Sequence, residues 1–199
     1  MTDNTTLDLG PQTRVIARLA QGVREEHMAG PTPCPDYTVQ GLLGHVLGLT
    51  VAFRDAARKD LGGSTDTAPD PAAVPELGAS WREELSKVLD ELAESWRDPA
   101  AWTGMTRAGG IDLPGDVAAA VATDELVIHG WDLARATGQD YDPDPAALRM
   151  CHDFLFAAAD DPSRGGGIFG PVVPVPSGAD LLDRAVGLSG RKPDWRPEH

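Results

Sequence analysis

Three side chains with metal-binding chemistry, His45, Glu125 and His129, stand out in the sequence. Glu125 and His129 are four residues apart, so on a helix both side chains project from one face, one turn from each other. The segment around them consists mostly of small and apolar residues, and an ionised glutamate buried there would cost several kcal/mol without a partner. The sequence therefore predicts a polar partner or a metal ion for Glu125.

His45 lies in a different apolar segment, at the edge of a stripe that includes Leu42 and Leu49. Its side chain is expected to point sideways into the core, where it can face Glu125 and His129. Two histidines and one carboxylate from facing helices would leave open coordination positions on one divalent ion, as in reactive sites for zinc, nickel, manganese or iron. The alternative is a buried His–Glu hydrogen-bonded pair without metal, and these residues alone leave both interpretations open.

Two further polar residues, Asp132 and His152, have side chains that could take part in such a site. Asp132 follows His129 by almost one turn, so it is expected either to accept a hydrogen bond from that imidazole or to pair with Arg135 on the same helix. His152 lies at the edge of another apolar face and is predicted to be a surface residue rather than a fourth ligand. The predicted ligand set therefore stays at three residues.

The elements that must position these side chains are helices. Apolar periodicity predicts helical segments at 11–27, 38–59, 77–96, 117–136, 145–159 and 180–188, whereas 61–75 and 102–115 are predicted to be irregular. The first four segments can share one core, which makes the fold class an all-α four-helix bundle, with an extra helix and an irregular carboxyl-terminal arm outside it. Loop 102–115 and that arm are expected to line the entrance to the site.

Length and composition limit the number of domains, the partners and the cellular location that are expected for this protein. A chain of 199 residues with 41% hydrophobic content fits one domain, 1–199. Its formal net charge of -14 argues against nucleic acid or an anionic membrane as a partner. The polar amino terminus and the lack of an apolar run of about 20 residues predict a cytoplasmic protein. Cys34 and Cys151 have no metal or redox spacing and fit isolated reduced thiols.

Two stretches resemble a known family. Residues 32–39 (TPCPDYTV) and 42–46 (LLGHV) are similar to the start of the second helix in the DinB-like family, which includes the amino-terminal domain of mycothiol-dependent maleylpyruvate isomerase. Residues 125–138 (ELVIHGWDLARATG) resemble the metal-ligand helix of the same family. The resemblance implies an up-down-down-up bundle and one divalent ion, most often zinc, held by His45, Glu125 and His129.

The resemblance also implies an activity. It suggests a thiol-dependent transferase or isomerase-like enzyme that takes mycothiol or a similar low-molecular-weight thiol as cosubstrate and a small electrophile as substrate, with the metal activating the thiol. The sequence ends at His199, without the carboxyl-terminal domain of the isomerase, so maleylpyruvate isomerisation itself is not expected. A non-catalytic metal- or small-molecule-binding stress protein and a metal-free helical scaffold are the alternatives, each as a monomer or homodimer.

Overall fold

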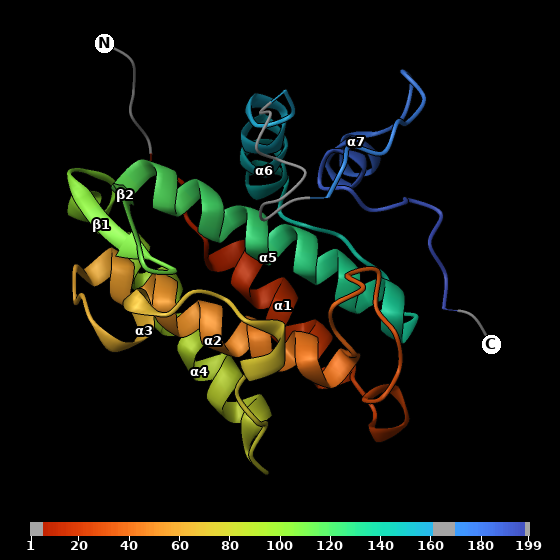
Figure 1. The fold of residues 1–199 in the computed structure, drawn as a ribbon, viewed down its shortest axis with the longest axis horizontal. Coiled ribbons are helices and arrows are strands. Elements are labelled where there is room, and N and C mark those ends of the chain that lie inside the picture. The colour runs from red at the N-terminus through yellow and green to blue at the C-terminus, as the bar shows by residue number, and fades with distance from the viewer. Residues whose placement is uncertain (1–5, 161–169, 198–199) are drawn as a thin grey trace.

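Four long helices form a bundle in the computed structural model, which describes residues 6–160 and 170–197 (Figure 1). They are α1 (Gly10–Gly22), α2 (Val39–Arg58), α4 (Trp81–Trp96) and α5 (Gly115–Thr137). The predicted mainly helical fold class is confirmed. The first and third predicted segments are too long: α1 ends at Gly22 and is followed by the 3-10 turn η1 (Glu25–His27), while α4 begins at Trp81.

Polar contacts fix the direction of α1 relative to α4. Arg97, just after α4, pairs with Asp8, just before α1, at 3.4 Å. At the other end, Arg82 of α4 donates a hydrogen bond of 2.7 Å to the carbonyl of Val23, which caps the end of α1. The start of each helix therefore lies beside the end of the other, and the two helices are antiparallel.

The remaining helix directions complete the predicted course. Arg54 donates to Glu91 at 2.8 Å and Arg58 donates to Ser95 at 2.9 Å, so α2 and α4 advance in the same direction. The colour gradient of Figure 1 shows α5 running opposite to α2. With α1 opposite to α4, the four helices have an up-down-down-up arrangement.

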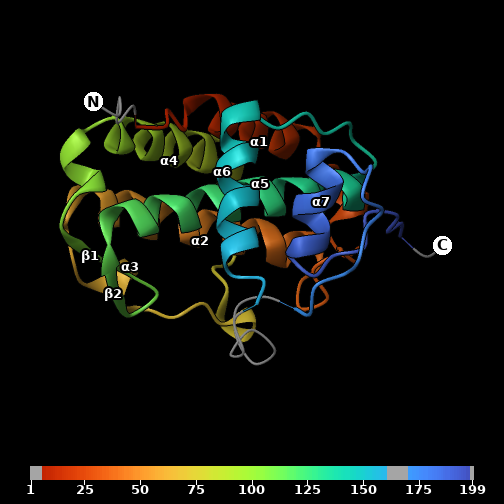
Figure 2. The same ribbon diagram turned by 90° about the horizontal axis from the view of Figure 1, so that it is seen from above.

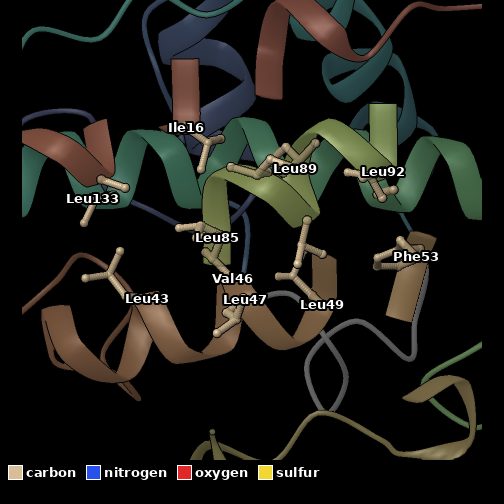
Figure 3. Packing of buried hydrophobic residues seen from close by; sticks show 14 of the residues in the cluster. Ile16, Leu43, Val46, Leu47, Leu49, Phe53, Leu85, Leu89, Leu92 and Leu133 are labelled. Atoms are coloured by element: carbon tan, nitrogen blue, oxygen red, sulfur yellow. The ribbon is translucent and has the colours of Figure 1, made fainter. Parts of the chain in front are cut away.

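The interior of the bundle is filled by aliphatic side chains from all four helices (Figure 3). Ile16 comes from α1, Leu43 and Val46 from α2, Leu89 from α4 and Leu133 from α5, and all are buried. Truncating such a side chain to alanine costs about 2–5 kcal/mol because a cavity remains. This packing makes α2 and α5 a rigid support for the side chains that they carry.

Helix α5 is covered on two sides. One side packs against α1 and α2 in the bundle. The opposite side is crossed by α6 (Pro145–Ala157) and α7 (Leu181–Leu188), which lie side by side (Figures 1 and 2). A second apolar cluster joins the three helices; its buried members are Val127, Ile128, Ala147, Cys151, Leu155 and Ala185. Helix α5 is therefore buried on most sides.

The loops contain more structure than the sequence indicated. Residues predicted to be irregular form the antiparallel hairpin of β1 (Met105–Ala108) and β2 (Ile111–Pro114). Gly109 and Gly110 make its turn with φ of +60° and +77°, a conformation that favours glycine at both positions. The hairpin escaped prediction because each strand has only four residues and no clear alternation.

The other loops contain single turns of helix. They are α3 (Gly63–Asp66), η2 (Pro71–Ala73) and η3 (Pro99–Trp102). The carboxyl-terminal arm is irregular at 170–180, as predicted, and its preceding part at 161–169 lies outside the described residues. Within the described ranges, the helices are too short or too polar to cross a bilayer.

Candidate metal centre

The structure brings the three predicted ligands together between α2 and α5. The Nε2 atom of His45 lies 3.4 Å from Oε2 of Glu125, and the Nε2 atom of His129 lies 3.0 Å from the same oxygen. The three ligand atoms all lie within 4.8 Å of one another. Ligands about 2.1 Å from a tetrahedral zinc ion lie about 3.4 Å apart, so this spacing fits three donors to one ion.

The hydrogen bonding of Glu125 favours a metal over a simple polar pair. Its Oε2 atom is buried, and no donor in the described part of the chain reaches it with hydrogen-bonding geometry, although both imidazoles lie nearby. The two imidazoles offset the charge of this buried carboxylate without aligned hydrogen bonds, and a cation between the three groups would be coordinated by all of them. The residues therefore fit a divalent ion, and its binding remains a prediction.

Electrostatics keep the acidic member of this group ionised. Burial opposes ionisation of Glu125, but its contacts with His129 and His45 outweigh burial and hold the pKa of the carboxyl well below its ordinary value. Burial also opposes the charge of His129, whereas contacts with Asp132 and Glu125 raise the pKa of this imidazole to about 9. A metal ion would have to displace that proton, because metal ligation requires a neutral imidazole.

The centre lies just below the surface. His45 and His129 are 9% and 7% exposed, and the side chain of Glu125 retains 15% exposure. An ion held there would have three protein ligands and lie close to solvent. This arrangement differs from structural zinc sites, whose four protein ligands leave no free position.

Tyr37 supports His45 from the loop before α2. Its ring stacks on the imidazole with centroids 4.9 Å apart and planes at 20°. Thr32 holds the loop in shape by placing its hydroxyl 2.9 Å from the carbonyl of Tyr37, and Thr38 caps α2 by accepting from the backbone of Gly41. The sequence did not indicate that Tyr37 contacts the candidate ligand His45.

Asp132 supports His129. Its Oδ2 lies 2.9 Å from Nδ1 of His129, which leaves Nε2 as the nitrogen that faces Glu125. Arg135 does not pair with Asp132; it donates to the carbonyl of Pro193 and lies over the ring of Trp131. Of the two interpretations of Asp132, the hydrogen bond to the imidazole is the one present.

Arg191 completes this arrangement and was missed by the sequence analysis. Its Nη2 donates to Oδ2 of Asp132 at 2.9 Å, and its Nε donates to Oδ1 at 3.3 Å. Burial opposes the charge of Asp132, but Arg191 and His129 hold the pKa of this carboxyl below its ordinary value. The contact joins residues 59 positions apart, so no helical spacing could have indicated it.

The segment that reaches the centre is neither of the two expected at its entrance. Arg191, which contacts Asp132, follows α7, whereas the carboxyl-terminal arm at 170–180 precedes α7 and contacts it through the amide of Val173, which donates to the carbonyl of Gly187. The 102–115 segment packs instead at the amino-terminal end of α5, where Thr106 donates to the carbonyl of Ala56. Glu125 lies ten residues beyond Gly115, about 15 Å further along the helix, so the expectation for this loop was wrong.

The remaining predicted residues lie outside the centre. His152 contacts Asp153 and stacks on Phe156 on α6, and it is not part of the ligand group. Both cysteines are free thiols, as predicted. Cys151 is buried and donates to Oδ1 of Asp124 at 3.3 Å, a contact that the sequence did not indicate.

Sequence comparison decides the family. The sequence model described as the mycothiol maleylpyruvate isomerase N-terminal domain matches residues 9–134, which is more than half of the chain. The chain belongs to this family. The matched region contains the three predicted metal ligands and Asp132, whereas Arg191 lies beyond it.

Two uncharacterised proteins of Mycobacterium tuberculosis, from the CDC 1551 / Oshkosh and ATCC 25618 / H37Rv strains, are relatives of the chain. Each is 29% identical over 130 residues. The match covers 65% of this chain and 65% of each relative, so it spans slightly less than two thirds of their length.

Two crystal structures have a similar fold. Mycothiol-dependent maleylpyruvate isomerase aligns with a TM-score of 0.61 and 17% identity, covering 92% of this chain and 86% of that chain. A histidine-to-alanine mutant of the isomerase aligns with a TM-score of 0.53 and 16% identity over 72% of this chain and 65% of that chain. At these identities the likeness concerns the fold.

Proposed function

We propose that this protein binds one divalent metal ion through His45, Glu125 and His129 and uses it in a thiol-dependent transferase or isomerase-like reaction. Mycothiol is the proposed cosubstrate, because the family to which the chain belongs is described by a mycothiol enzyme. Zinc is the first candidate for the ion, with nickel, manganese and iron as alternatives. The substrate is proposed to be a small electrophile.

The observation that carries the proposal is the buried Oε2 atom of Glu125. Two imidazole nitrogens lie within 3.4 Å of this oxygen, yet no donor among the described residues satisfies it. A metal-free scaffold would have to keep this carboxylate and a charged imidazole together in its core, and removing both ions from water is costly. A bound cation would balance the carboxylate and coordinate both rings.

The chemistry follows from the donor set. When bound, a divalent ion supplies Lewis acidity that stabilises a thiolate well below the thiol's free pKa of about 8.5. The chain's own contribution is to hold three donors on two packed helices, close to the surface. Asp132 fixes the orientation of His129, and Tyr37 fixes that of His45.

The activity can be tested with mycothiol and monochlorobimane. The zinc-loaded protein is expected to accelerate formation of the fluorescent conjugate, and prior treatment with a chelator should remove the acceleration. His45→Ala should also remove it because a ligand is lost. His152→Ala is the matched control, since this histidine lies on α6 away from the ligands, and it should behave as the wild type.

The same assay separates the proposed enzyme from a binding protein. If the protein holds zinc but the conjugation rate equals that of the metal and thiol without protein, catalysis of thiol addition is refuted and a non-catalytic metal-binding function remains. If the wild type takes up no divalent ion at all, the metal centre itself is refuted.

A further inference from the structure

The contact between Asp132 and Arg191 involves both oxygens of a completely buried carboxylate. Asp132 is 0% exposed, and both of its oxygens accept from Arg191, while Oδ2 also contacts Nδ1 of His129. An arginine that donates to both oxygens of a carboxylate through two nitrogens restricts rotation of the carboxylate, whereas a single hydrogen bond leaves it free to rotate. The carboxylate is therefore held in one orientation when it meets the imidazole.

The end of α7 directs Arg191 into this position. Gly190 has a φ of +89°, its amide donates to the carbonyl of Gly187, and the next amide, of Arg191, donates to Val186. This is the Schellman pattern, in which a left-handed glycine reverses the chain after a helix. Arg191 Nη1 also donates to the carbonyl of Ser189, so the guanidinium is held from both ends.

Helix α7 is itself anchored on the side of α5 that faces away from the bundle. Ala185 of α7 packs in the apolar cluster with Val127 and Ile128 of α5. The carboxyl-terminal segment thus packs through α7 on the side of α5 that faces away from the bundle (Figure 2). Through Arg191 it also reaches Asp132, which contacts the candidate ligand His129. Arg191 is 13% exposed at its side chain, so the contact is largely shielded from water.

We propose that Arg191 is a positioning residue that orients the ligand His129 through Asp132, so that the segment after α7 sets how tightly the centre binds a divalent ion. The inference rests on the proposed function in one respect: one of its tests measures metal affinity. Arg191 does not contact the ligand atoms. It supplies the two donors that hold Asp132 in one orientation, and Asp132 in turn keeps Nε2 of His129 directed at Glu125.

The first test compares zinc affinity in two arginine variants. Arg191→Met removes the charge and both donors but keeps a long apolar side chain. Loss of a residue that supports a ligand weakens metal binding about 10- to 100-fold, and this loss is expected here. Arg135→Met is the matched control, because Arg135 also bonds the carboxyl-terminal segment, at Pro193, but does not touch Asp132. Its affinity should equal that of the wild type, and equal losses in both variants would overturn the proposal.

A double-mutant cycle tests whether Arg191 acts through Asp132. If it does, the variant that combines Arg191→Met with Asp132→Asn should bind zinc no more weakly than Asp132→Asn alone. Additive losses would show that Arg191 acts by another route. Arg191→Lys should recover only part of the affinity, because an ammonium group cannot reproduce the two-nitrogen contact.

A measurement without metal separates this inference from the proposed function. In chelator-treated protein, proton NMR should show a slowly exchanging, strongly downfield imidazole N–H from His129, identified by its loss in His129→Gln. Its exchange with solvent should become faster in Arg191→Met and stay unchanged in Arg135→Met. A wild type that binds no zinc but shows this difference would refute the metal centre and support the positioning role. Equal exchange in both arginine variants would refute the positioning role even if zinc binds.

Discussion

Two neighbouring carboxylates on α5 have opposite environments. Glu125 faces α2 and lies between the Nε2 atoms of two histidines. Asp124 lies against Cys151 of α6 and is 3% exposed. The pKa of Glu125 is held well below its ordinary value, whereas burial and the nearby charge of Glu125 raise the pKa of Asp124 to about 7.

The comparison shows that burial by itself does not determine the ionisation of an acid. Burial disfavours the charged form of both groups. Glu125 overcomes this cost because two basic side chains face it, while the partner of Asp124 is a neutral thiol. Two acids next to each other on α5 therefore have different roles. Glu125 faces α2 and is a candidate metal ligand, whereas Asp124 faces α6 and is a structural group.

The largest expected effect is on metal content. Glu125→Gln should weaken zinc binding more than about 100-fold, because even residues that only support ligands contribute 10- to 100-fold. Asp124→Asn should retain about one equivalent of zinc, since Asp124 points to α6. Elemental analysis after gel filtration measures both. Zinc retained by Glu125→Gln, or lost from Asp124→Asn, would reverse the roles assigned to the two acids.

A second prediction concerns the cost of burying Asp124. Its folded-state pKa is raised from 3.8 to about 7, so the stability that it contributes is full below pH 3.8 and is lost as the pH rises through about 7. Asp124→Asn carries no charge and should escape this loss. Denaturant unfolding should show the variant more stable than the wild type at pH 8 by up to about 4 kcal/mol, with a much smaller difference at pH 5. An equal difference at both pH values would contradict the assignment.

A third prediction concerns His129, which contacts Glu125. Without metal, the protein should lose stability as the pH rises and this imidazole loses its proton. The folded-state pKa of His129 is raised from 6.5 to about 9, so its contribution is full below pH 6.5 and is lost as the pH rises through about 9. The loss should reach up to about 3 kcal/mol in chelator-treated protein and be absent in His129→Gln. Thermal unfolding across this pH range measures it, and a flat profile in the wild type would contradict the prediction.

The smallest expected effect is the gain in stability on adding metal. Zinc at about 100 times its dissociation constant should stabilise the wild type by about 2.7 kcal/mol, because the ion binds the folded state alone. A chelator should lower the melting temperature again. Asp124→Asn should show the same gain and Glu125→Gln none, as measured by differential scanning calorimetry. Equal gains in the two variants would mean that zinc binds elsewhere.

Much of the fold and the set of candidate ligands could be predicted from the sequence. Apolar spacing located the helices, and the four-residue interval placed Glu125 and His129 on one face of α5. The position of His45 at the edge of an apolar stripe indicated that it would face them, as it does. These features follow from helix geometry and the burial of apolar surface, which act over a few residues.

The tertiary structure alone decided which partner each polar side chain meets. Asp132 had two interpretations in the sequence, and only the folded chain selects His129 and Arg191 over Arg135. The difference between Glu125 and Asp124 likewise arises from the helices packed against α5. Contacts between residues 59 positions apart depend on chain reversals, such as the one after α7, and no local periodicity encodes them. The sequence thus determined which residues could form a metal centre, and the packing determined how they are oriented and charged.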